Sequence, residues 1–158
     1  MASAQEHVAL IERLYAGLDS HDGAAMAACY APQAVFEDPA FGELRDGAPA
    51  DMWRMLTGNA KQLDAKVLER QADDRGGTAV WEAHYKFAQT GRDVVNIVHS
   101  RFVFEDGLIV DQRDSFDLRA WAAQALGPAG KILGLTPLLG PMIRRRTAGQ
   151  LAAYRAGA

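Results

Sequence analysis

Residues 81–116 have the sequence WEAHYKFAQTGRDVVNIVHSRFVFEDGLIVDQRDSF, and this stretch decides the fold class. In residues 81–87 apolar and polar side chains alternate, which is the period-two pattern of a strand with one apolar face. Glycine-containing turn signals follow at Thr90-Gly91 and Asp106-Gly107. They separate two more extended segments, 94–104 and 108–116. The stretch therefore predicts an antiparallel meander of three long strands.

Helical patterns lie on both sides of these strands. Apolar residues recur on one stripe between Val8 and Leu18, and an alanine-rich segment, Ala24 to Tyr30, predicts a second short helix ended by Pro32. A third helix is expected from Pro49, and Asp117 is placed to cap a last regular helix. Further expected segments are an extended piece at 35–39, a weak edge strand at 66–73 and the last regular helix at 118–126.

Helices followed by antiparallel strands are typical of an α+β domain with helices packed on one face of a curved sheet. We expect this domain to span residues 1–126. Residues 127–158 differ in kind, because glycines and prolines interrupt an apolar segment that is followed by Arg144-Arg145-Arg146. We expect this extension to be a helical or irregular apolar arm that packs on the domain or on a partner subunit.

The amino-acid composition excludes several classes of function. The 158 residues carry 17 Lys and Arg against 20 Asp and Glu, so no broad positive field exists to attract nucleic acid. Cys29, the single cysteine, excludes an internal disulfide framework, and no basic-then-apolar leader or membrane-length apolar run is present. No metal-ligand spacing or phosphate-binding glycine loop occurs. We therefore expect a soluble cytoplasmic protein without metal, cofactor, nucleic-acid or membrane partner.

Two motifs in order resemble a known family. Val35-Phe36-Glu37-Asp38-Pro39-Ala40-Phe41-Gly42 and the segment from Gly107 to Leu118 are similar to the NTF2-like superfamily. The SnoaL-like, ketosteroid isomerase-like and limonene epoxide hydrolase-like branches are the most similar. This resemblance implies a cone formed by a strongly bent sheet around helices, with a deep apolar pocket at its wide end. It also implies a homodimer, with the outer sheet face as the frequent interface.

The same resemblance nominates catalytic residues. Asp38 occupies the place of the proton-shuttling aspartate of ketosteroid isomerases, and Asp114 that of the water-activating aspartate of limonene epoxide hydrolases. A carboxylate facing an apolar pocket loses hydration, so its pKa rises and it accepts protons near neutral pH. Tyr15 lies one residue from the family's tyrosine donor position, and Ser100 falls at the second donor position. Trp81 and Ala83 stand where epoxide hydrolases have their arginine and second aspartate.

The face of the strand on which Asp114 lies depends on the turn at residues 105–107. A three-residue turn at 105–107 pairs Ser100 with Gln112 and puts Asp114 on the apolar face. A two-residue Asp106-Gly107 turn instead puts Asp114 beside His99, because a one-residue slip exchanges the faces. The residues alone leave both turns open, and the resemblance favours the first.

A two-residue Thr90-Gly91 turn would pair Tyr85 with Asn96 and Trp81 with Ser100. The expected substrate pocket then includes aromatic and polar side chains from the third helix and the two long strands. These are Trp53, Trp81, Tyr85, Asn96, Ser100 and Phe102.

The sequence supports two hypotheses on function. The first is a cofactor-independent acid/base enzyme of the SnoaL-like type, with isomerase, hydrolase or cyclase chemistry on a steroid-, terpenoid- or polyketide-like molecule. In it Asp38 or Asp114 moves a proton, and Tyr15, Asn96 or Ser100 orients the substrate. The alternative is a non-catalytic homodimeric module that binds a hydrophobic small molecule or a protein partner.

Overall fold

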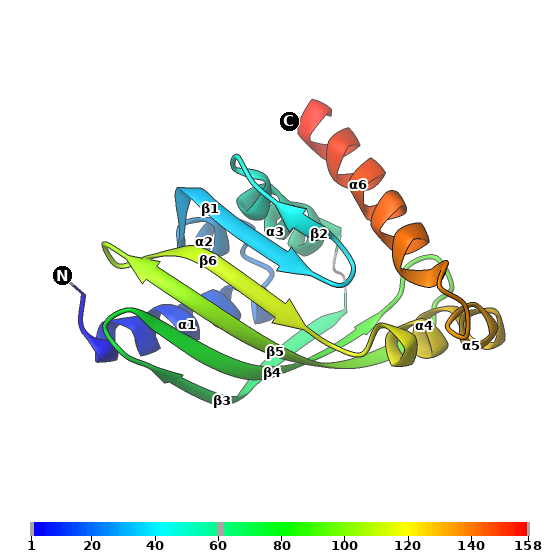
Figure 1. Ribbon diagram of the computed structural model, residues 1–158, viewed down its shortest axis with the longest axis horizontal. Helices are drawn as coiled ribbons and strands as arrows, with labels where there is room; N and C mark the ends of the chain where they lie inside the picture. Colours follow the sequence, from blue (N-terminus) through cyan, green and yellow to red (C-terminus); the bar gives the residue numbers. More distant parts are fainter. Residues whose placement is uncertain (1, 60–61, 158) are drawn as a thin grey trace.

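A computed structural model describes residues 2–59 and 62–157, and its strands form a curved six-stranded sheet (Figure 1). The strand order is β2-β1-β6-β5-β4-β3. The pairs β3–β4, β4–β5 and β5–β6 are antiparallel, so the predicted meander is confirmed. The strand bounds are β1 Tyr30–Asp38, β2 Gly42–Leu44, β3 Leu63–Ala72, β4 Gly76–Lys86, β5 Asp93–Glu105 and β6 Leu108–Ser115.

The helices pack on one face of the sheet and at one of its ends (Figure 1). A capping box starts the first helix, because the Ser3 hydroxyl accepts from the Glu6 amide and the Glu6 carboxylate accepts from the Ser3 amide. The first three helices share one core with the inner face of the sheet, which confirms the α+β class. The helix bounds are α1 Ala4–Asp19, α2 Gly23–Ala27, α3 Ala48–Asn59, α4 Leu118–Leu126, α5 Pro128–Leu133 and α6 Leu139–Gly157.

The second helix is shorter than predicted, and β1 begins earlier. The helix ends at Ala27, and Tyr30 already pairs in parallel with Ile109 of β6. The Ile109 amide donates to the Cys29 carbonyl at 2.9 Å. This pairing joins segments far apart in the sequence, so local helix propensity could not indicate it. Pro32 falls in the part of β1 where the register shifts, a position that tolerates a missing amide donor.

The turn between β4 and β5 is wider than the Thr90-Gly91 prediction. The Phe87 amide donates to the Arg92 carbonyl at 2.9 Å. As a result Ala79 lies opposite Ser100 and Trp81 opposite Val98, so the predicted register was wrong by two residues. A shift of two residues keeps every side chain on its face. The inner face predicted for these strands is therefore preserved.

The segment after β6 covers one end of the cone. Asp117 caps α4 by accepting from the Ala120 amide at 3.0 Å, which confirms the predicted helix at 118–126. It is not the last regular helix, because α6 forms a helix of 19 residues, with Pro141 in the first turn, where a missing amide donor is tolerated. Helix α6 then contacts the loop after β1, where Thr147 donates to the Ala40 carbonyl at 2.8 Å and Arg144 donates to the Pro39 carbonyl at 3.2 Å. These contacts hold the extension against the chain's own domain.

Candidate active site

The two candidate carboxylates lie at the same end of neighbouring strands. Strands β1 and β6 run in parallel, so their C-terminal ends meet at one edge of the sheet, with Glu37 opposite Arg113. Asp38 and Asp114 follow these two residues by one position and share the inner face with Phe36 and Gln112. The charge of Asp38 is one of the causes that raise the pKa of Asp114. The fold thus brings together two acids 76 positions apart in the sequence.

The inward direction of Asp114 comes from a tight turn combined with a bulge. Asp106 and Gly107 both have positive φ, at 51° and 75°, as a two-residue type I′ hairpin turn requires. That turn alone would put Asp114 beside His99. The register shifts by one residue between Val103 and Phe104, however, and Ser100 lies opposite Asp114. The shorter turn is therefore present, and the bulge restores the inward face predicted from the longer one.

Asp114 is enclosed by apolar groups and by donors. It is 9% exposed, and burial is the largest cause that raises its pKa to about 7. Hydrogen bonds from Ser100 and from the Gln112 amide, at 3.0 Å, lower the pKa, while the charge of Asp38 raises it. The carboxyl group is therefore near half-protonation at neutral pH, which suits both proton donation and proton acceptance.

A directional hydrogen-bond chain fixes the Gln112 side chain. The Trp53 indole donates to the Tyr30 hydroxyl at 2.7 Å, and the Tyr30 hydroxyl donates to Gln112 Oε1 at 2.5 Å. Because Gln112 Oε1 is an acceptor here, its amide nitrogen faces Asp114. All of these polar groups are buried. Tyr30 and Gln112 were missed by the sequence interpretation, although Gln112 lies two residues before Asp114 on a strand and so shares its face.

Ser100 and the side chains bonded to it form a second polar group beside Asp114. The Ser100 hydroxyl accepts from the Trp81 indole at 2.9 Å and is 2.8 Å from the Tyr15 hydroxyl. The Tyr15 ring lies 4.8 Å from the Trp81 ring, and Tyr15 is 1% exposed. Burial raises the pKa of Tyr15 well above its ordinary value, and the charge of Asp114 raises it further, so this group stays a neutral donor. Three predicted site residues thus gather around Asp114.

Asp38 ends β1 and shapes the loop after it. Its Oδ1 accepts from the amides of Ala40 at 2.9 Å and Phe41 at 2.5 Å. Burial is the largest cause that raises its pKa to about 6, and these two hydrogen bonds lower it. The aspartate therefore has the local turn role common for Asp before proline, and it also carries a carboxyl that titrates near neutrality.

The remaining predicted pocket residues lie apart from Asp114. Tyr85 is half-buried, and its hydroxyl accepts from the Trp121 indole at 2.5 Å. The charge of Asp38 raises the pKa of Tyr85, which places the phenol near that carboxylate. Phe102 is 2% exposed and packs in the core 5.7 Å from the Phe104 ring, while Asn96 is half-buried opposite Ala83.

The side chains around Asp114 are almost fully buried, with Tyr15, Phe102 and Gln112 at most 2% exposed. Two shallow hollows of the described surface lie elsewhere, one over β3 and β4 near Arg70 and Thr78, the other between Arg92 and Lys131. At the end of the cone, Trp121, Tyr85 and Phe116 pack with the apolar side chains of α4 to α6. The expected deep pocket therefore stays a prediction.

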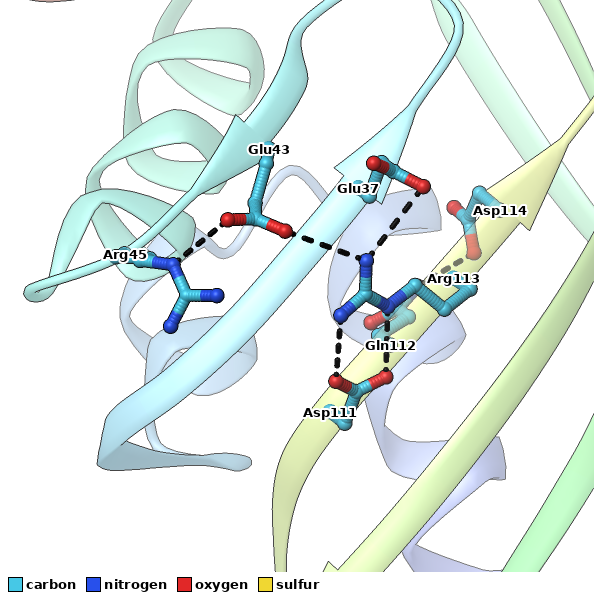
Figure 2. Close-up of polar contacts among 7 residues, drawn as sticks. All are labelled: Glu37, Glu43, Arg45, Asp111, Gln112, Arg113 and Asp114. Atoms are coloured by element: carbon cyan, nitrogen blue, oxygen red, sulfur yellow. Dashed lines mark hydrogen bonds and ion pairs between the residues drawn. The ribbon is translucent and has the colours of Figure 1, made fainter.

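The neighbouring arginine does not neutralise Asp114. Arg113 and Asp114 point to opposite sides of β6, and Arg113 donates to both carboxylate oxygens of Asp111 at 3.0 Å (Figure 2). Arg113 also lies 3.5 Å from Glu37 and from Glu43, on the outer face. The simple structural explanation for Asp114, an ion pair with Arg113, does not apply.

Gln112→Leu is expected to raise the pKa of Asp114 by about one unit above its value near 7, because the carboxylate loses a donor that favours its charged form. Tyr30→Phe should have the same sign and a smaller size, since Gln112 keeps its amide but loses the restraint on its direction. A carbon-13 NMR titration of the Asp114 carboxyl measures both changes. Identical titration curves in wild type and Gln112→Leu would remove Gln112 as a positioning residue.

The sequence from Ile11 to Gln112 matches the family model described as SnoaL-like domain. The chain belongs to the SnoaL-like domain family. The match covers more than half of the chain and includes Tyr15, Asp38 and Ser100, whereas Asp114 lies two residues beyond its end. No curated protein sequence matches the chain.

Solved structures with the same fold extend the SnoaL-like comparison. An LEH-like epoxide hydrolase from M. tuberculosis is 21% identical with a TM-score of 0.65, covering 85% of this chain and 98% of that one. A putative polyketide cyclase from Xanthomonas campestris pv. campestris is 18% identical with a TM-score of 0.63, covering 78% and 98%. TerC co-crystallised with polyporic acid is 13% identical with a TM-score of 0.65, covering 75% and 97%. These likenesses confirm the NTF2-like cone.

Proposed function

We propose that this SnoaL-like chain is a cofactor-independent acid/base enzyme that moves a proton on a small lipophilic molecule, steroid-, terpenoid- or polyketide-like, by isomerase, hydrolase or cyclase chemistry. The observation that carries the proposal is the pair Asp38 and Asp114. Both carboxyls are on the inner face with pKa values raised to about 6 and about 7, and among the described residues no arginine forms an ion pair with either. Titratable groups shifted in this way by an apolar setting are typical of catalytic acids and bases.

The different environments of Asp38 and Asp114 give the two carboxyls different catalytic roles. At neutral pH the Asp38 carboxyl, with the lower pKa, is mostly ionised and serves as the base. Asp114 retains a proton in a large fraction of molecules and serves as the acid. Ser100 and Tyr15 lie beside Asp114 as neutral donors for a developing negative charge on the substrate. The proposal requires an opening between Tyr85 and Trp121, because the interior is closed there.

Asp38→Asn tests the base. On a panel of epoxides, unsaturated ketones and polyketide-like ketones, the variant is expected to lose about 10²- to 10⁴-fold in kcat/KM, since an amide cannot accept the proton. Glu37→Gln is the matched control, because Glu37 is adjacent, exposed and directed to the outer face beside Arg113. Equal activity of Asp38→Asn and wild type on every active substrate would remove Asp38 from the mechanism.

The closed interior favours one second candidate, a non-catalytic module that binds a hydrophobic small molecule or a protein partner. Tyr15, Phe102 and Gln112 are at most 2% exposed, so the interior is packed like a core. In this case a lipophilic compound would raise the melting temperature of the protein and would be recovered unchanged. Turnover of any compound in the panel, lost in Asp38→Asn, would exclude this candidate.

We also propose a homodimer through the outer face of the sheet. Val95, Ile97 and Val103 are 41–46% exposed on this face, where a monomer would leave them in water. Ile97→Glu is expected to shift the mass in light scattering from a dimer to the 17.1 kDa monomer at micromolar protein. Gln33→Glu, an exposed change on β1, should leave the dimer intact. A monomeric wild-type protein would contradict the proposal.

A further inference from the structure

The segment from the end of α5 to the start of α6 carries the three most exposed large apolar side chains described in the molecule, with a fourth beside them. Leu135 is 75% exposed, Ile132 69%, Leu138 63% and Met142 46%. We call these four residues the apolar tip. They belong to the segment that joins α5 to α6, which Figure 1 shows beyond the end of the sheet. Such a cluster is costly in water and marks a contact surface.

The sequence around the apolar tip is strongly basic. After Asp117 the chain has no Asp or Glu and six Lys or Arg, whereas the first 117 residues have eleven Lys or Arg and twenty Asp or Glu. The overall charge of −3 therefore hides a body near −9 and a C-terminal segment near +6. An asymmetry of this size indicates attraction of the segment to an anionic surface. The cations are Arg119, Lys131, Arg144, Arg145, Arg146 and Arg155.

Helix geometry places cations beside the apolar tip. Leu138 and Met142 are four residues apart, and Arg145 and Arg146 follow Met142 by three and four, so these side chains form one stripe of the helix. The opposite stripe of α6 is buried through Leu139, Ile143 and Leu151. Lys131 is exposed and precedes Ile132 of the apolar tip by one residue. Among the described residues no carboxylate forms an ion pair with Lys131, Arg145 or Arg146.

We propose that this segment docks on an anionic lipid surface, with the apolar tip in the headgroup region and Lys131, Arg145 and Arg146 on lipid phosphates. Apolar anchoring combined with a basic patch is the two-signal arrangement that gives stable association with a membrane surface. Among the described helices, none has the length and apolar character of a membrane span. The proposal departs from the expectation of no membrane partner, because folding gathers side chains that are scattered in the sequence.

A second copy of the chain fits the apolar tip less well. Four side chains on a narrow turn fall short of the roughly 800 Å² per partner that a stable interface buries. The stripe that carries these cations has no carboxylate, so the same stripe of a second copy would offer them no partner. The charge of the segment and its shape both favour an extended anionic surface.

Co-sedimentation with vesicles tests the proposal. The full chain is expected to sediment with phosphatidylcholine vesicles that contain about a third phosphatidylserine, and not with phosphatidylcholine alone. Raised salt should release it. Arg145→Glu/Arg146→Glu should reduce the affinity for these vesicles roughly tenfold or more. Leu135→Ser/Leu138→Ser should also weaken binding, and the binding that remains should still be released by salt.

Two matched variants away from the tip and from the outer sheet face control for charge and for apolar area. Arg13→Glu/Arg75→Glu makes the same change of charge, and Tyr154→Ser removes an exposed apolar side chain of α6. Both should bind vesicles like the wild type. No sedimentation, equal sedimentation with both kinds of vesicle, or equal loss in the control variants would overturn the proposal. So would dissociation of a dimer by the tip variants with unchanged vesicle binding.

Discussion

Asp114→Asn is expected to reduce kcat/KM by about 10²- to 10⁴-fold on any substrate that the chain turns over, the range typical for removal of a general acid or base. Asparagine has nearly the same shape, and its two ends match the neighbours of Asp114. Its oxygen accepts from Gln112 and its nitrogen donates to the Ser100 hydroxyl. The variant should therefore fold, and the loss would reflect missing proton transfer.

Asp111→Asn is the matched control for Asp114→Asn. Asp111 is on the same strand, but its carboxylate binds Arg113 on the outer face (Figure 2). Its replacement should leave kcat/KM within about twofold of the wild type, because exposed ion pairs contribute little. Asp114→Asn with wild-type activity and wild-type pH dependence would exclude Asp114 as the acid.

The second large effect concerns stability against pH. The pKa of Asp114 is raised from 3.8 to about 7, so between these values the folded state binds more protons than the unfolded state. Stability is therefore greatest below about pH 4 for this group and falls as pH rises through 7. About three pKa units correspond to about 4 kcal/mol in the free energy of unfolding. The pKa of Asp38 is raised to about 6, so this group also lowers stability as the pH rises, over the lower part of the same pH range.

Asp114→Asn should remove most of this decline. At pH 8 the variant is expected to unfold with a free energy a few kcal/mol above that of the wild type, and at pH 4 the two should be nearly equal. Urea unfolding followed by tryptophan fluorescence across this range measures the difference. Asp111→Asn should decline with pH as the wild type does. Parallel curves for Asp114→Asn and wild type would show that the buried carboxyl is not protonated in the folded state.

These two predictions have opposite signs for one substitution, and a structural role cannot produce both. A residue that only supports the fold would lose stability when replaced. A buried acid kept for chemistry costs stability at the pH where it is ionised, and its removal recovers that stability while activity is lost. The combination therefore separates the catalytic proposal from the binding module.

Local patterns in the sequence determined much of the fold. The alternation in residues 81–87 and the apolar stripe of the first helix follow from periods of two and 3.6 residues, which each segment carries by itself. Asp117 as a helix cap is equally local. The motifs around Asp38 and around Asp114, with their resemblance to the superfamily, predicted the curved sheet and nominated the two aspartates.

Only the tertiary structure decided how the site is assembled. Neighbouring strands set the start of β1 at Tyr30, and a bulge with a tight turn points Asp114 inward. Gln112 and Tyr30 join the site through contacts across 82 positions of sequence. Such pairings depend on hydrogen bonds and packing between distant segments, which no local period records. The sequence by itself determined which elements form and which acids to consider, and long-range pairing decided which way those acids face and what surrounds them.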